Sequence, residues 1–192
     1  MSLDIAVHDT SPAAPGDLEL LQRFLNLHVH DSDGRSQDPP AEVIHGFLVE
    51  RGLIRREERL TQADRERYLR LRDAFRSLIV ADAGATISGA DAQAIDDAGR
   101  TAGLHPHFHA SGTPTLEPKA RGVAAAFGTM VAIAFVSAFD GTFAHLKLCA
   151  DETCRSAFYD RSKNHSGRWC SMAVCGNRAK VRAWRERQRP GA

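Results

Sequence analysis

Apolar residues recur at intervals of three and four positions through most of the chain before residue 140. This spacing places them on one face of an α-helix. Tyr68, Leu71 and Phe75 form one such stripe, and Thr61 with Asp64 forms a capping-box variant ahead of it. The pattern predicts helices over residues 17–29, 40–52, 61–78, 88–103 and 122–139.

The segment 122–139 contains no charged residue and reaches the lower length limit of a membrane span. Alanine, serine, threonine and Gly128 dilute its hydrophobicity, and the rest of the chain has the composition of a soluble protein. We therefore expect a central helix that is buried on nearly all sides, and no membrane partner.

Residues 105–110 alternate in polarity and are followed by the break Gly112-Thr-Pro114, which predicts a small β-hairpin. The three histidines His105, His107 and His109 would then share one face of a strand, where a metal cage is conceivable. No carboxylate at a matching spacing accompanies them, so exposed histidines on an edge strand are the preferred interpretation.

The net charge of +1 conceals two opposite regions. Residues 1–148 carry 15 basic and 20 acidic side chains, whereas residues 149–192 carry 10 basic and 4 acidic ones. We expect a helical domain over 1–148 and a separate small domain over 149–192, in a mainly α fold with minor β structure. The basic domain suggests an anionic partner, although a solvated basic terminus would have the same composition.

All four cysteines lie in the basic region, as two close pairs: Cys149 with Cys154, and Cys170 with Cys175. Two pairs joined by a short connector are typical of a structural zinc site with four thiolate ligands. Two disulfides are the alternative. Because residues 1–14 have no apolar core that would mark a signal peptide, we expect the cytoplasm, where zinc is favoured over disulfides.

Between the pairs, Phe158 and Tyr159 favour a strand and Trp169 begins the return, which predicts a second β-hairpin. A helix is expected from Ala173 to Pro190, with Cys175 in its first turn. One face of this helix is a predicted packing stripe: Val174, Asn177, Val181, Trp184 and Gln188. We expect the Asn177 amide to hydrogen-bond the backbone of the zinc turns.

The neighbouring face of the same helix is basic and could lie in a DNA groove or along phosphates. Solvated arginines that pair with the acidic domain are the plainer alternative. The candidate DNA contacts on the helix are Arg178, Lys180, Arg182, Arg185 and Arg189, with Arg187 extending the positive surface. The hairpin would add Arg161, Lys163 and Arg168.

Three stretches carry a resemblance to a known family: Cys149-x4-Cys154-x3-Phe158-Tyr-Asp-Arg-Ser162, Arg168-Trp-Cys-Ser-Met172 and Cys175-Gly-Asn-Arg-Ala-Lys180. They strongly resemble the CGNR zinc finger, which is named after the tetrapeptide found here at 175–178. The preceding segment is similar to the ABATE domain in Phe24-Leu-Asn26 and Leu71-Arg-Asp-Ala-Phe-Arg76. The resemblance implies a bacterial DNA-binding regulator, of a kind sometimes described as stress-induced.

A pocket near Asn26 and Arg72 would suit a small anionic effector, an expectation that rests partly on this resemblance. No nucleophile elbow, phosphate-binding loop or dinucleotide fingerprint is present, so we do not expect an enzyme. A single small module makes few DNA contacts, which favours a homodimer. The alternative function is a small-molecule-binding or interaction protein in which the zinc finger is purely structural.

Overall fold

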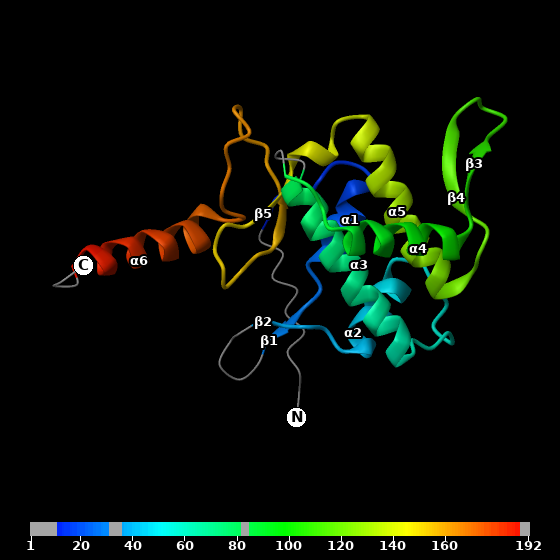
Figure 1. Ribbon diagram of the computed structural model, residues 1–192, viewed down its shortest axis with the longest axis horizontal. Helices are drawn as coiled ribbons and strands as arrows, with labels where there is room; N and C mark the ends of the chain where they lie inside the picture. Colours follow the sequence, from blue (N-terminus) through cyan, green and yellow to red (C-terminus); the bar gives the residue numbers. More distant parts are fainter. Residues whose placement is uncertain (1–10, 31–35, 82–84, 189–192) are drawn as a thin grey trace.

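A computed structural model describes residues 11–30, 36–81 and 85–188, and it confirms a mainly α fold with minor β structure (Figure 1). The body contains α1 (Leu18–Leu25), α2 (Ala41–Glu50), α3 (Gln62–Ala81), α4 (Gly89–Ala102) and α5 (Gly122–Phe139). Three antiparallel pairs join β1 (Val29–His30) to β2 (Ser36–Gln37), β3 (Leu104–Phe108) to β4 (Pro114–Pro118), and β5 (Leu146–Leu148) to β6 (Ala157–Tyr159). A π-helical turn (Met172–Gly176) leads into α6 (Asn177–Arg187).

The predicted helix ends are confirmed where capping residues mark them. The Thr61 hydroxyl accepts the Asp64 backbone N–H at 3.1 Å, and the Asp64 carboxylate accepts the Thr61 N–H at 3.0 Å. Ser88 caps α4, and Gly103 ends it with a left-handed φ of 62°. The helix expected over 17–29 is shorter, because Val29 leaves it to pair with Gln37.

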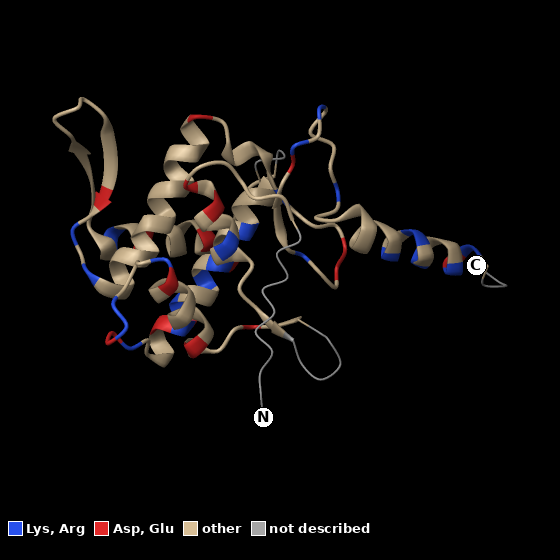
Figure 2. Cartoon of the chain, turned by 180° about the vertical axis from the view of Figure 1, so that it is seen from behind, with Lys and Arg blue, Asp and Glu red and all other residues tan. Residues whose placement is uncertain are grey.

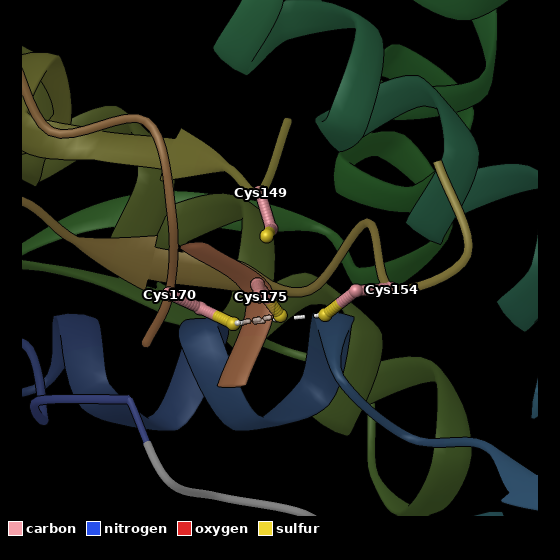
Figure 3. A group of neighbouring side chains, drawn as sticks. All are labelled: Cys149, Cys154, Cys170 and Cys175. Atoms are coloured by element: carbon pink, nitrogen blue, oxygen red, sulfur yellow. Dashed lines mark hydrogen bonds between the residues drawn. The ribbon is translucent and has the colours of Figure 1, made fainter. Parts of the chain in front are cut away.

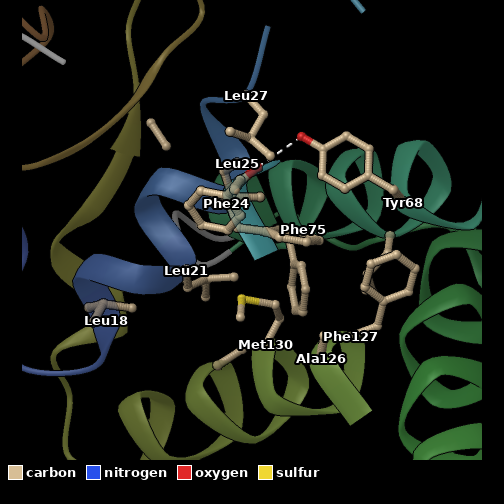
Figure 4. Close-up of a cluster of buried hydrophobic side chains, with 14 of the residues drawn as sticks. Leu18, Leu21, Phe24, Leu25, Leu27, Tyr68, Phe75, Ala126, Phe127 and Met130 are labelled. Carbon is tan, nitrogen blue, oxygen red and sulfur yellow. Dashed lines mark hydrogen bonds between the residues drawn. The ribbon is translucent and has the colours of Figure 1, made fainter. Parts of the chain in front are cut away.

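The core of the body gathers aromatic rings from several helices (Figure 4). Phe24 of α1, Tyr68 and Phe75 of α3 and Met130 of α5 are fully buried. The Phe24 and Tyr68 rings meet edge to face at 4.8 Å, and the Tyr68 hydroxyl donates to the Phe24 carbonyl at 2.8 Å. The buried hydroxyl is therefore satisfied, and it fixes α3 against α1.

The helix α5 has the bounds that the sequence predicts, but the expectation of burial on nearly all sides is wrong. Its inner face packs on α1 and α4, and Gly128 is so close to the Ala102 side chain that a Cβ would clash. The outer face near the C-terminal end leaves Phe139 80% exposed, beside Phe135 and Val136. Within the described residues this is the one helix long and apolar enough to cross a membrane, by length and composition alone.

The sequence predicts a hairpin between the cysteine pairs, but the predicted partner strand is wrong. Strand β6 does contain Phe158 and Tyr159, but it pairs with β5, which precedes Cys149, rather than with the segment around Trp169. Leu146 of β5 and Ala157 of β6 are buried in the core of the body. Apolar burial thus draws the two strands together, and the hairpin begins before the expected boundary at 149.

The helix α6 projects away from the body (Figure 1) and contains no buried residue. The apolar stripe predicted to pack is therefore exposed: Val174, Val181 and Trp184 all face solvent, with Trp184 57% exposed. Arg178 and Arg182, in the first turns of α6, tie the helix to the zinc module.

Candidate metal centre

The four cysteines converge from two separate backbone segments (Figure 3). Cys149 directly follows β5, and Cys154 closes the turn before β6. Cys170 precedes the π-helical turn, and Cys175 lies within it. The predicted position of Cys175 in a first helical turn is thus close to the observed one, in the turn that precedes α6.

The sulfur atoms have the spacing of a tetrahedral thiolate site. All four lie within 4.8 Å of one another, with Cys154 to Cys170 at 3.6 Å and Cys170 to Cys175 at 3.5 Å. Zn–S bonds of about 2.3 Å in a tetrahedron separate the sulfurs by about 3.8 Å. None of the four is in a disulfide. These residues form a site for one structural zinc ion, as the sequence predicts.

Arg178 links the site to the base of α6. Its Nη2 donates to Cys175 Sγ at 3.2 Å, and its Nε lies 2.9 Å from the Asp151 carboxylate. Burial raises the pKa of the Cys175 thiol, and the hydrogen bond from Arg178 acts in the opposite direction. A zinc ion with four thiolates carries a net negative charge, so a cation at this position stabilises the form that binds metal.

Asp151 is fully buried in the turn between the first two cysteines, and the sequence did not mark it as functional. Its Oδ1 accepts from Arg182 Nη2 at 2.8 Å and from the Thr153 hydroxyl at 2.9 Å. Burial raises the pKa of this carboxyl, but the hydrogen bonds from Arg182 and Thr153 outweigh burial and lower the pKa to about 2. Asp151 therefore holds two arginines of α6 against the first cysteine turn.

A second buried carboxylate, Asp160, organises the loop between the cysteine pairs. It accepts from Lys147 Nζ at 2.7 Å and from the backbone N–H groups of Ser162 at 3.0 Å and Gly167 at 2.8 Å. A Cβ at Gly167 would stand 2.8 Å from the carboxyl carbon of Asp160. The loop thus closes on a charged group, and a side chain at residue 167 would clash with that group.

Each residue of the tetrapeptide 175–178 has a role in this arrangement. Cys175 is a zinc ligand, and a Cβ at Gly176 would lie 2.9 Å from Met172 Sδ. The Asn177 amide donates to the Ala173 carbonyl at 3.0 Å, which confirms the predicted bond to the backbone of a zinc turn. Arg178 completes the set through its contacts to Cys175 and Asp151.

The residues predicted to contact DNA lie in two environments. In the loop, Arg161 donates to the Ala13 carbonyl at 2.7 Å, Arg168 lies over the Trp169 ring at 5.4 Å, and Lys163 is exposed. Arg178 and Arg182 bind Asp151. Figure 2 shows basic positions along α6 in blue. The exposed cations of this helix that do not bind Asp151 are Lys180, Arg185 and Arg187. Arg189 lies outside the described residues.

The predicted ligand residues Asn26 and Arg72 line one cleft of about 450 Å³, where the body meets the zinc module. Both are already engaged. The Asn26 amide accepts the Ala157 N–H at 2.7 Å and donates to the Ala157 carbonyl at 2.8 Å. Arg72 donates to Asp38 at 2.7 Å and to the adjacent carboxylate of Asp73 at 2.9 Å. Arg76 lines the same cleft, and the sequence did not mark it as a ligand residue.

Fold and site together define a mainly helical protein with a four-cysteine zinc module. Residues 145–188 match the family model of the CGNR zinc finger, which covers the hairpin β5–β6, all four cysteines and α6. No curated protein matches the chain.

Proposed function

We propose that this protein is a DNA-binding transcription regulator of the bacterial cytoplasm, without catalytic activity, whose helix α6 contacts DNA. The observation that carries the proposal is the surface of α6. This helix leaves the body, buries none of its residues, and exposes cations with Glu186 as its one acidic residue.

The order of residues around α6 fits the major groove. At 100° per residue, Val181 and Trp184 share a narrow apolar face. Lys180 and Arg187 lie along one flank of that face and Arg185 along the other. The major groove of B-DNA accepts one α-helix between two phosphate backbones, so a helix with cations on both flanks can contact both backbones. A solvated helix has no need of the apolar face between them.

The zinc site then has a positioning role. Zinc fixes Cys175, and Asp151 holds Arg178 and Arg182, so the base of α6 has one direction relative to the body. Two of the predicted DNA contacts are thereby bound within the protein. The phosphate contacts are assigned instead to Lys180, Arg185 and Arg187.

The direct test compares two double variants in duplex binding at several salt concentrations. Arg185→Ala/Arg187→Ala removes two exposed charges of α6, whereas Arg56→Ala/Arg59→Ala removes two exposed charges of the body. The first should weaken binding and reduce the slope of log K against log salt by about 2, since each phosphate contact contributes about 0.9. The second should behave as the unaltered protein. Equal binding by the α6 variant, or no salt-sensitive affinity of the zinc-loaded protein, would overturn the proposal.

A single α6 is too short to specify a long site, so the proposal includes a homodimer that reads two half-sites. Selection of bound sequences from a random duplex pool, at fixed salt, measures this directly. A dimer selects paired half-sites at a constant spacing, whereas a monomer selects one short site.

A second function is favoured by Arg76, and it would place a small anion in the cleft between body and module. The Nε of Arg76 is buried without a hydrogen-bond partner among the described residues, while its Nη2 donates to the Leu25 carbonyl at 2.9 Å. Burial and the nearby charge of Arg72 lower the pKa of the Arg76 guanidinium, so an anion would relieve an uncompensated charge. Arg155 and Arg178 line the same cleft, which connects an anion there to the base of α6.

Thermal unfolding with inorganic phosphate or citrate tests this second function. A bound anion should raise the melting temperature in a saturable manner. Arg76→Gln should remove the effect, whereas Arg70→Gln, an exposed position on the same helix, should retain it. The absence of any shift with both anions, or a shift that persists in Arg76→Gln, would count against the cleft as their site.

A further inference from the structure

The hairpin β3–β4 brings three histidines and a carboxylate onto one face. The register pairs His105 with Glu117 and His107 with Thr115. The sequence shows no carboxylate at a matching spacing, but the structure supplies one from the opposite strand. Glu117 is distant from them along the sequence, but antiparallel pairing places it on the opposite strand, on the face that the histidines share.

The ligand atoms of His107, His109 and Glu117 are already close. All three lie within 4.8 Å of one another, and His109 Nε2 is 3.3 Å from Glu117 Oε1. The two imidazole rings meet edge to face, with centroids 4.7 Å apart. His105 stands outside this group, although its buried Nδ1 has no hydrogen-bond partner among the described residues.

A neighbouring hydroxyl orients the carboxylate. Thr115 Oγ1 donates to Glu117 Oε1 at 2.8 Å and lies 3.0 Å from His109 Nε2. Metal-binding carboxylates are typically held by such outer hydrogen bonds, which fix the direction of their remaining lone pairs. The three side chains thus form an organised cluster rather than a chance meeting of long, mobile groups.

The donor set selects a class of metal. Imidazole nitrogens suit zinc, copper and nickel, whereas calcium and magnesium prefer oxygen ligands. Metal–nitrogen and metal–oxygen bonds of about 2.0–2.2 Å place ligand atoms about 3.3–3.6 Å apart in a tetrahedron. His109 and Glu117 already have this separation, and small rotations of the His107 side chain would bring its nitrogen to the same ion.

We propose that the hairpin β3–β4 binds one divalent late transition-metal ion, such as Zn²⁺ or Ni²⁺, through His107, His109 and Glu117. This site is separate from the cysteine site and differs from it in kind. The cysteine site has four thiolate ligands, three of them buried, whereas the hairpin site has three partly exposed ligands and a position open to solvent. Its ion exchanges readily and links one strand of the hairpin to the other.

The test is a Zn²⁺ titration of the full-length protein that already holds zinc at its cysteines, followed by calorimetry. The unaltered protein should bind one further equivalent. His107→Ala/His109→Ala should lose it, and Glu117→Gln should bind it at least about tenfold more weakly. The control is His165→Gln. His165 is exposed and its ring stacks on that of His145 at 4.0 Å, but among the described residues it belongs to no group of side chains that could hold a metal ion.

Co²⁺ in place of the second equivalent of Zn²⁺ identifies the donor atoms. Binding at the hairpin should produce d–d absorption without the thiolate-to-cobalt charge-transfer bands of the cysteine site. Circular dichroism of each variant checks that the fold is retained, which is expected because the side chains are on the surface. The proposal is overturned if the unaltered protein binds no second equivalent, if that equivalent survives in the double histidine variant, or if His165→Gln loses it too.

Discussion

The helical body and the zinc module are held together by different interactions. The body has a continuous apolar core that includes the fully buried rings of Phe24, Tyr68 and Phe75. The separate core of the module consists of cysteines with Phe158 and Trp169, and its loops close on two buried carboxylates, Asp151 and Asp160. A segment this short cannot bury enough apolar surface to be stable by itself, so metal ligation and the ion pairs of the buried carboxylates take the place of a larger apolar core.

This difference implies that each region responds to its own perturbation. Removal of apolar volume should destabilise the body, whereas chelation and acid should act first on the module. The hairpin β5–β6 joins the two, since its Leu146 and Ala157 belong to the core of the body. Four substitutions test whether the two regions respond independently, and they follow in order of decreasing expected effect.

Loss of zinc should have the largest effect. Cys170→Ser removes a ligand, and a structural zinc site of this type is worth about 10–16 kcal/mol at neutral pH. Amide hydrogen exchange should show that residues 149–187 lose protection while α1, α3 and α5 keep theirs. Simultaneous loss of protection in the body would show that the two regions form a single cooperative unit.

A cavity in the body should have the next largest effect. Phe24→Ala removes a ring that contacts Phe47, Tyr68 and Phe127, and should lower the free energy of unfolding by about 3–5 kcal/mol. Its zinc content by elemental analysis should stay at that of the unaltered protein. Phe139→Ala, at an exposed position, is the control and should change stability little.

The buried carboxylate of the loop, Asp160, should make a pH-dependent contribution to the free energy of unfolding. Burial alone would raise the pKa of Asp160, but the hydrogen bonds from Lys147, Ser162 and Gly167 hold it well below its usual range. A carboxyl with a lowered folded-state pKa stabilises the fold above its unfolded pKa, about 4, and loses that contribution as the pH falls below it. Asp160→Asn should therefore cost about 2 kcal/mol at pH 7.

The free energies of unfolding of Asp160→Asn and the unaltered protein, measured with urea at a series of pH values, should approach each other below about pH 4. Asp96→Asn, at an exposed position, provides the comparison. If the difference in the free energy of unfolding stays constant down to the acid unfolding transition, the loss of stability comes from the changed shape of the side chain rather than from its lost charge.

The smallest effect should come from a helix cap. Thr61→Ala removes the hydroxyl that accepts the Asp64 N–H, and should destabilise α3 by about 1 kcal/mol. The change belongs to the body alone, so zinc affinity in a competition with a chelator should be unaltered. A weakened zinc site in this variant would contradict the separation of the two regions.

The zinc ligands could be predicted because each cysteine pair is close in sequence, and two such pairs joined by a short connector are typical of a zinc site with four thiolates. The helix α5 and the hairpin β3–β4 were likewise marked by an unbroken apolar run and by alternation. These signals are local, since each depends on neighbours within a few residues.

The features that escaped prediction depend on contacts between distant residues. Strand β5 has three residues and is recognisable only through its pairing with β6. Asp151 is one acidic residue among many until burial and two arginines distinguish it. Glu117 joins the histidines through the register of two strands, and the burial of the Arg76 Nε atom arises only in the packed molecule.

The bidentate bond between the Asn26 amide and the Ala157 backbone has a consequence for modularity. It fastens the end of α1 to β6, while β5 supplies the partner strand from before the first cysteine. A zinc finger transplanted from Cys149 onward would lose both supports and would expose the edge of β6. A chimera that exchanges such modules between proteins should therefore begin before His145 and carry an asparagine in the host at the position of Asn26.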